Sequence, residues 1–158
     1  MVRIDNVNIG LSAKLKNMQP ESTRDRFNPK GNLLFVQFRS ENETWGRTLD
    51  SLIEEDVNLK MRLSEILKNM NQRDDELLER IEHFHNRLLS VIETIGFLRL
   101  EVTKIEKELY QVYSLNIGNL SELWQKQMKL RKEMERAEYD FHVLKFNLNN
   151  FIADVLKT

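Results

Sequence analysis

The sequence predicts an all-α fold, an elongated antiparallel three-helix bundle with coiled-coil packing, preceded by an irregular N-terminal arm. From about Phe35 to Val155, apolar residues recur at alternating steps of three and four. A 3.5-residue repeat specifies long helices packed along seams. The repeat falls into three blocks of nearly equal length. Only five Gly and two Pro occur in 158 residues, too few for the many turns of an all-β domain.

The repeat occupies 33 seam positions, 11 in each block, and all but three of them are apolar. The three polar exceptions are Asn42, Asp56 and Gln127. The seam positions are Phe35, Phe38, Asn42, Trp45, Leu49, Leu52, Asp56, Leu59, Leu63, Ile66 and Met70; Leu77, Ile81, Phe84, Leu88, Val91, Ile95, Leu98, Val102, Ile105, Leu109 and Val112; and Leu120, Leu123, Gln127, Leu130, Met134, Ala137, Phe141, Leu144, Leu148, Phe151 and Val155.

The first helix is expected over residues 32–71. Asn28-Pro29-Lys30-Gly31 is typical of a turn, and Asn32 is placed to cap the helix that follows. Residues 33–38 would also suit a strand by local propensity. We favour the helix because Phe35 and Phe38 continue the seam spacing set downstream.

The second helix is expected over residues 74–115. The heptad phase slips near residue 73, which is compatible with either a turn or a stutter inside one continuous helix. A turn at residues 71–75 is favoured because Asp74 is a good N-cap. Asp75 and Glu76 would then lie in the first turn, where the helix dipole favours negative charge.

The third helix is expected over residues 120–157. Gly118 suits the end of the preceding helix and Asn119 suits the cap of the next. Three helices of equal length joined by tight turns would pack side by side in an up-down-up order. Further apolar residues beside the seams fit helices that each touch two neighbours. These residues are Ile53, Val57, Leu67, Leu78, Leu89, Ile92, Leu100, Trp124, Met128, Val143, Phe146 and Ile152.

Residues 1–31 differ from the rest and are expected to form an extended or flexible arm. Both prolines lie there, and apolar residues alternate weakly as in a strand. Residues 1–40 hold seven basic and three acidic side chains, a balance of +4, so the remaining residues sum to −5 within the net charge of −1. We expect interaction residues in the arm at Val2, Ile4, Val7, Ile9, Leu11, Arg24, Arg26 and Phe27.

The composition limits where the protein is expected to be located and which kinds of site it can form. The chain has no cysteine, which excludes disulfides and thiolate metal sites. The N-terminus has no continuous apolar run of the kind that a secretory signal contains. No apolar stretch in the chain approaches the ~20 residues needed to span a bilayer. We therefore expect a cytoplasmic protein without membrane insertion.

Few residues suggest catalysis. His83 and His85 are two apart and point to different sides of a helix. Glu138 and His142 have metal-ligand spacing, with Glu93 opposite them after folding, but surface charge pairing accounts for them better. No Gly-rich phosphate loop, nucleophile elbow or HExxH motif occurs. We expect no enzyme, no catalytic residue, no metal and no cofactor.

Two features inside the helices need a reason. If Asp56 is buried in the seam, it lowers the stability of the fold, and its role would be to fix the register of the helices or the choice of partner. The alternative is that Asp56 lies at a splayed edge of the bundle. Gly46 and Gly96 would come to about the height of Ala137, where small residues could let backbones approach or make room for Trp45. The alternative is one tolerated glycine in each helix.

These observations predict a non-catalytic structural or adaptor subunit of a larger assembly. Its partners would be proteins, either further copies in a homo-oligomer or the other subunits of a complex, bound by the helix sides and the arm. The alternative is a nucleic-acid-binding module that uses the basic arm. Aromatic residues for base stacking are scarce there, since Phe27 is the only one among the first 31 residues.

Overall fold

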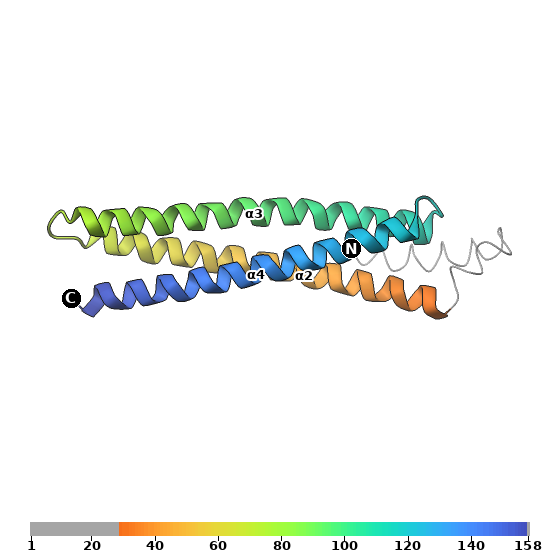
Figure 1. Ribbon diagram of the computed structural model, residues 1–158, viewed down its shortest axis with the longest axis horizontal. Coiled ribbons are helices and arrows are strands. Elements are labelled where there is room, and N and C mark those ends of the chain that lie inside the picture. The colour runs from red at the N-terminus through yellow and green to blue at the C-terminus, as the bar shows by residue number, and fades with distance from the viewer. Residues whose placement is uncertain (1–28, 158) are drawn as a thin grey trace. The chain divides into compact units, whose positions relative to one another are not determined.

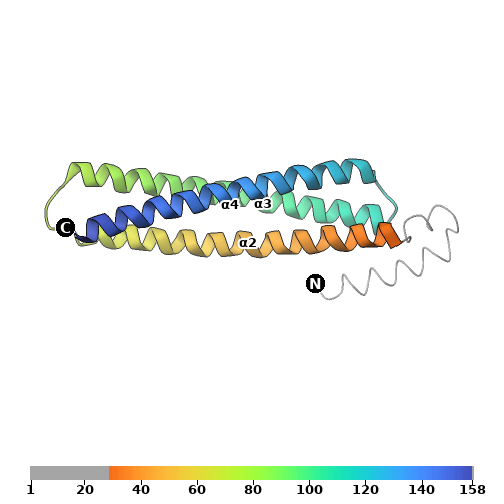
Figure 2. The ribbon, with the colours of Figure 1, turned by 60° about the horizontal axis from the view of Figure 1, so that its bottom comes forward.

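The computed structural model describes residues 29–157, with side chains from Leu33 onward. The chain forms α2 (Pro29–Lys68), α3 (Asp75–Ser114) and α4 (Leu120–Lys157), as Figure 1 shows. The predicted all-α fold is confirmed, and the helix contacts are those of a three-helix bundle. The second view, in Figure 2, again places α3 and α4 alongside α2.

The helices divide into two compact units, and each unit takes a segment from all three helices. Unit 1 contains α2 up to Trp45, α3 from Glu101 and α4 up to Lys129. Unit 2 contains α2 from Gly46, α3 up to Leu100 and the rest of α4. Because α3 runs opposite to α2 and α4, each unit is an antiparallel three-helix arrangement.

The first helix begins at Pro29, three residues before the predicted start. Pro suits the first turn of a helix because its fixed φ is helical and its missing N–H would have no partner there. Residues 29–31 are therefore helical rather than part of a turn, and Asn32 lies inside α2 instead of capping it. Residues 33–38 are helical as predicted.

The turn between α2 and α3 confirms the favoured break over a continuous helix. α2 ends at Lys68, and α3 starts at Asp75 after a non-helical segment. The Leu77 N–H donates to Asp74 Oδ1 at 3.1 Å. Asp74 is thus the predicted N-cap, satisfying one of the unpaired N–H groups at the helix start.

The turn between α3 and α4 confirms the predicted cap at Asn119, but Asn116 and not Gly118 takes the left-handed position directly after α3. Asn119 Oδ1 accepts hydrogen bonds from the N–H groups of Ser121 at 2.8 Å and Glu122 at 3.2 Å. Gly118 has a φ of 102°, although the first left-handed residue after α3 is Asn116, with a φ of 56°. Asn tolerates that region better than most residues because its short side chain bonds locally.

The predicted seams form the core. Of the 33 seam positions, only Leu120 at the start of α4 is exposed; the others are buried or half-buried. Leu49, Leu88 and Leu148 have no exposed surface. Seam spacing in the sequence therefore identified the inward face of every helix, because residues three and four apart lie on one side of a helix.

The prediction that the further apolar residues also face neighbouring helices is confirmed only in part. Only Ile152 among them is buried, and Ile53, Leu78, Ile92 and Met128 are half-buried. A helix in a three-helix arrangement is fully covered only along its seam. The exposed remainder is Val57, Leu67, Leu89, Leu100, Trp124, Val143 and Phe146.

Candidate functional site

The predicted interaction residues of the arm lie outside the described residues. They remain predictions from the sequence. They are Val2, Ile4, Val7, Ile9, Leu11, Arg24, Arg26 and Phe27.

Asp56, the other predicted interaction residue, lies inside unit 2. Its side chain has no exposed surface, so it does not sit at a splayed edge. The Lys60 ammonium lies 2.9 Å from Asp56 Oδ1, one helical turn along α2. Burial raises the pKa of the Asp56 carboxyl, and the positive charges of Lys60 and His85 offset part of that increase. Asp56 is therefore a core carboxylate whose ionisation opposes folding.

The other two polar seam residues meet in unit 1. Gln127 of α4 donates from Nε2 to Asn42 Oδ1 at 2.9 Å and to Glu41 Oε1 at 2.8 Å on α2. Asn42 and Gln127 are fully buried. A polar pair of this kind favours one lengthwise alignment of α4 against α2, since a shifted helix would leave both amides without a partner.

Ion pairs join the helices at the surface of each unit. In unit 1, Lys126 Nζ lies 2.8 Å from Glu108 Oε1, and this hydrogen bond raises the pKa of Lys126. In unit 2, Lys145 Nζ lies 2.6 Å from Glu55 Oε2, and Arg99 pairs with Asp50. Exposed pairs stabilise little, but they occupy charges that would otherwise be available to a ligand.

A second carboxyl with a raised pKa lies in unit 1. Desolvation raises the pKa of Glu106 on α3, and the Glu43 carboxylate on α2 raises it further. Neither Asp56 nor Glu106 lines the pocket described below. The perturbed carboxyls therefore lie apart from the cavity, unlike those of most active sites.

The candidate metal ligands are not brought together. Within residues 29–157, no group of three or more His, Asp or Glu side chains is arranged to hold a metal ion. Glu93 and His142 are exposed and Glu138 is half-buried.

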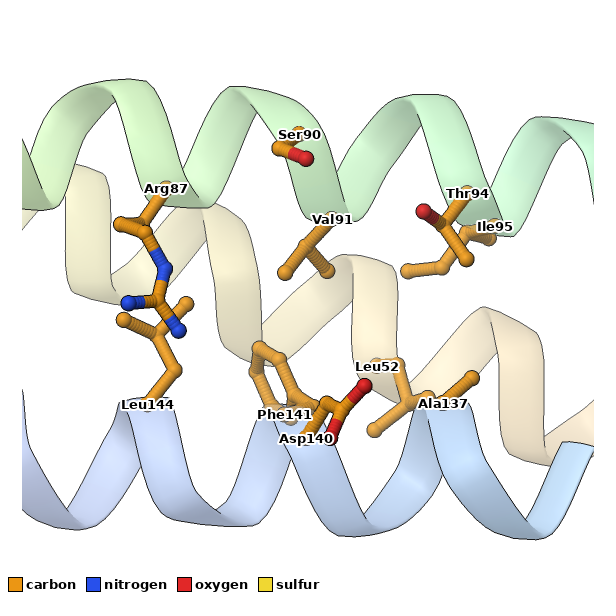
Figure 3. Close-up of a pocket in the computed structure, with 10 residues that line it drawn as sticks. All are labelled: Leu52, Arg87, Ser90, Val91, Thr94, Ile95, Ala137, Asp140, Phe141 and Leu144. Atoms are coloured by element: carbon orange, nitrogen blue, oxygen red, sulfur yellow. The ribbon is translucent and has the colours of Figure 1, made fainter.

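Unit 2 contains a pocket of about 300 Å³ between α3 and α4, at the lower end of the range for ligand sites. Figure 3 shows side chains from both helices around it, with Leu52 of α2 behind. The spacing rules did not reveal it, because the cavity depends on how side chains of different size meet across two helices. Its lining residues are Leu52, Arg87, Ser90, Val91, Thr94, Ile95, Ala137, Asp140, Phe141 and Leu144.

The exposed apolar side chains form the remaining candidate surface. On α4, Tyr139, Val143 and Phe146 are 68%, 38% and 65% exposed. They are spaced by four and three residues, so they share one helix face. The buried Phe141, Leu144 and Leu148 define the opposite face. Val143 and Phe146 were expected to widen the inward face of the third helix, and their exposure makes them available to a partner.

No helix within residues 29–157 combines the length and apolar character needed to cross a bilayer. Comparison of the chain with protein-family models, with curated protein sequences and with solved structures finds no match.

Proposed function

We propose that this protein is a non-catalytic structural or adaptor subunit of a larger protein assembly. The sides of its helices and its N-terminal arm would supply the contacts. One observation carries the proposal: large apolar side chains that the fold leaves exposed occur on all three helices. Burying them against another protein would be favourable, since apolar surface is driven from water.

The exposed side chains are of the kind that protein interfaces use. In unit 2, Phe97 is 56% exposed and Phe146 is 65% exposed; in unit 1, Trp124 is 45% exposed. Isolated exposed apolar residues are ordinary on a protein surface, whereas groups along one face favour an interaction site. Aromatic residues are enriched in the cores of interfaces.

The distribution of ionisable groups supports a binding role over a catalytic one. An enzyme positions groups with shifted pKa values in a cleft. Here the carboxyls with a raised pKa, Asp56 and Glu106, do not line the pocket, and Asp56 is fully buried. Fixing the alignment of helices is the role that this placement favours.

The arm is proposed as a second docking element, and point substitutions test it in the full chain. Val7→Asp with Leu11→Asp replaces two apolar arm residues by charges. Asn6→Asp with Asn8→Asp adds the same charge to the same segment and serves as the matched control. Each tagged chain would be expressed in its native source and isolated after cross-linking, with the complexes sized and their components quantified by mass spectrometry.

We expect the native chain to run in a complex well above its own 18.9 kDa. The control should retain that complex and the double apolar variant should lose it. A native chain that runs as a monomer in its source would contradict the assembly role. If the apolar variant keeps the complex, the arm is not a docking element and the helix sides alone would carry the interaction.

A further inference from the structure

We propose that residues 4–18 of the N-terminal arm pack as a fourth helix against α2 and α4 of unit 1 in the same chain, antiparallel to α2. This goes beyond the proposed function, because it assigns the arm a contact with its own bundle in the isolated chain. The proposal joins an exposed apolar patch in unit 1 to an apolar stripe at helical spacing in the arm that adjoins it.

The patch lies where α2 and α4 meet in unit 1. The rings of Phe38 and Trp124 are 5.6 Å apart between centroids. On α4, Leu120, Trp124 and Met128 follow one another at steps of four, so they form one stripe along the helix. Leu34 precedes Phe38 by four residues, as Leu120 precedes Trp124. Because α2 and α4 run in the same direction, Leu34 lies on the side of α2 next to that stripe.

Several side chains of this patch have much of their surface in water. Trp124 is 45% exposed, Leu120 is 44% exposed, and Leu33, next to Leu34, is 57% exposed. Leu34 and Met128 are half-buried. Apolar side chains grouped along one face favour an interaction site, unlike scattered ones. We call these five residues the Trp124 patch.

The arm contains an apolar stripe that would cover this patch. Five of its apolar residues recur at steps of three, four, four and three. On a helix they would fall within about 80° of the circumference, a single narrow face. Pro20 follows directly after the stripe, where helices commonly end. The five residues are Ile4, Val7, Leu11, Leu15 and Met18.

Such a helix needs a surface to pack on. A segment of 15 residues is marginal as an isolated helix in water, and Gly10 in its interior weakens it further. Burial of the stripe against the Trp124 patch would supply the missing stabilisation. The position of Ile9 distinguishes this helix from a strand. A strand would place Ile9 on the same face as Val7 and Leu11, whereas a helix places it on the opposite side.

The connection between the arm and α2 favours packing within one chain. α2 begins at Pro29, so residues 19–28 are left to join the two helices. Ten residues are enough for the turn between antiparallel neighbours. The segment from Val7 to Met18 and the segment from Leu33 to Thr44 each span about 17 Å as helices. The covalent connection also keeps the arm at a high effective concentration beside the patch.

Most exposed apolar side chains of unit 2 are too far away for this packing. The chain from Met18 to Pro29 spans about 40 Å at most. Val57 and Met61 lie about 42 and 48 Å along α2 from Pro29. Phe146 of α4 is next to Lys145, whose partner Glu55 is already about 39 Å along α2. The stripe could reach Phe146 only with a fully extended connection.

Two exposed apolar faces closer to Pro29 are too short for the stripe. On α3, Phe97 and Leu100 are followed on the same face by the exposed Lys104. On α2, Val36 is followed four residues later by the exposed Ser40. The Trp124 patch extends over three successive steps of α4 and includes side chains of α2. It is therefore the surface that a stripe of five residues fits best.

Cross-linking of cysteine pairs tests both the site and the direction of the arm. The native chain has no cysteine, so an introduced pair is the only source of disulfide. One matched pair combines Leu11→Cys with Met128→Cys, and the other combines Met18→Cys with Leu120→Cys. The controls exchange the partners, Leu11→Cys with Leu120→Cys and Met18→Cys with Met128→Cys. All four variants change the same surface positions.

The matched pairs should form a disulfide within the chain, at a rate independent of protein concentration. They should form it roughly tenfold faster than the exchanged pairs, because exchange displaces the two sulfur atoms along the bundle by about 12 Å. Mass spectrometry of the digested chain identifies each disulfide. Non-reducing electrophoresis separates a disulfide within the 18.9 kDa chain from one between two chains.

Aspartate substitutions in the otherwise native full chain provide a second test. Leu15→Asp places a charge in the stripe, and Ile9→Asp makes the matched change on the opposite side of the proposed helix. Leu15→Asp should increase quenching of tryptophan fluorescence by acrylamide, since Trp124 would become more accessible while Trp45 stays buried. It should also reduce the helix content measured by circular dichroism. Ile9→Asp should leave both measurements at the native value.

Equal rates for matched and exchanged pairs would overturn the proposal, and so would disulfides formed only between chains. An effect of Ile9→Asp equal to that of Leu15→Asp would also overturn it, because the two positions would then share a face. All these measurements use the purified chain, so their failure is distinct from failure of the proposed function. A chain that fails them but runs in a large complex in its source would keep the adaptor role.

Discussion

The Gln127 amide of α4 donates a 2.9 Å hydrogen bond to Asn42 Oδ1 of α2, with both side chains fully buried. The pair is incompletely satisfied, since Asn42 Nδ2 and Gln127 Oε1 have no hydrogen-bond partner in the structure. Buried polar groups without partners cost stability. The pair therefore weakens unit 1 relative to an apolar seam while it favours one alignment of the two helices.

Substitution of one residue of the Asn42–Gln127 pair should lower the stability of the protein more than substitution of both. Gln127→Leu leaves Asn42 without its partner in the core and should lower the free energy of unfolding by about 1–3 kcal/mol. Asn42→Leu combined with Gln127→Leu should restore stability to the native level or above, because both polar groups are gone. Urea denaturation measures each variant. Gln125→Leu, at an exposed position of α4, is the control and should change little. Equal losses in the single and double variants would show that the two residues are not coupled.

Removing the buried charge at Asp56 should stabilise the protein. Asp56→Leu should raise the free energy of unfolding at neutral pH by about 1 to 4 kcal/mol, as replacement of buried ionic groups by apolar residues often does. Lys60, one quarter exposed, can turn its ammonium to water when its partner is gone. Thermal melts and light scattering would report stability and oligomeric state. If both stay unchanged, Asp56 does not hold register at a cost to stability.

The pH dependence at Asp56 has a definite sign. Burial raises the pKa of Asp56 in the folded chain above its ordinary value, so the unfolded chain loses this proton first as pH rises. The native free energy of unfolding should therefore fall across the window from the ordinary pKa to the raised one. The advantage of Asp56→Leu should be smaller in acid than at neutral pH. Glu54→Leu, an exposed neighbour, should show no such pH-dependent advantage.

Glycine substitutions should have opposite signs inside helices and in the turn. A Cβ added at Gly46 or Gly96 would meet no atom within 4 Å, so neither glycine is needed for close helix approach. Gly46→Ala and Gly96→Ala should each raise the free energy of unfolding by up to ~1 kcal/mol. Gly118→Ala should lower it by about 1–3 kcal/mol, because Gly118 has a φ of 102° and the new Cβ would lie 3.3 Å from Val112 Cγ2. Thermal denaturation checks all three, and stabilisation by Gly118→Ala would contradict the strain argument.

The sequence predicted a helix start correctly where a side chain caps the backbone N–H groups of residues close to it in the chain. Asp74 and Asn119 cap α3 and α4 as expected, since capping requires only residues two or three positions apart. The start of α2 was misplaced because Pro29 fits both a turn and the first turn of a helix. The sequence gives no local signal that separates those two uses.

The sequence by itself determined the inward face of each helix and the three polar interruptions, because a 3.5-residue spacing fixes which side chains share a face. Only the tertiary structure decided that Gln127 of α4 meets Asn42 of α2, and that Val143 and Phe146 face water. The pocket beside Ala137 was also invisible to spacing. Pairing, exposure and cavities depend on how neighbouring helices are rotated and aligned, which residues close in sequence do not specify.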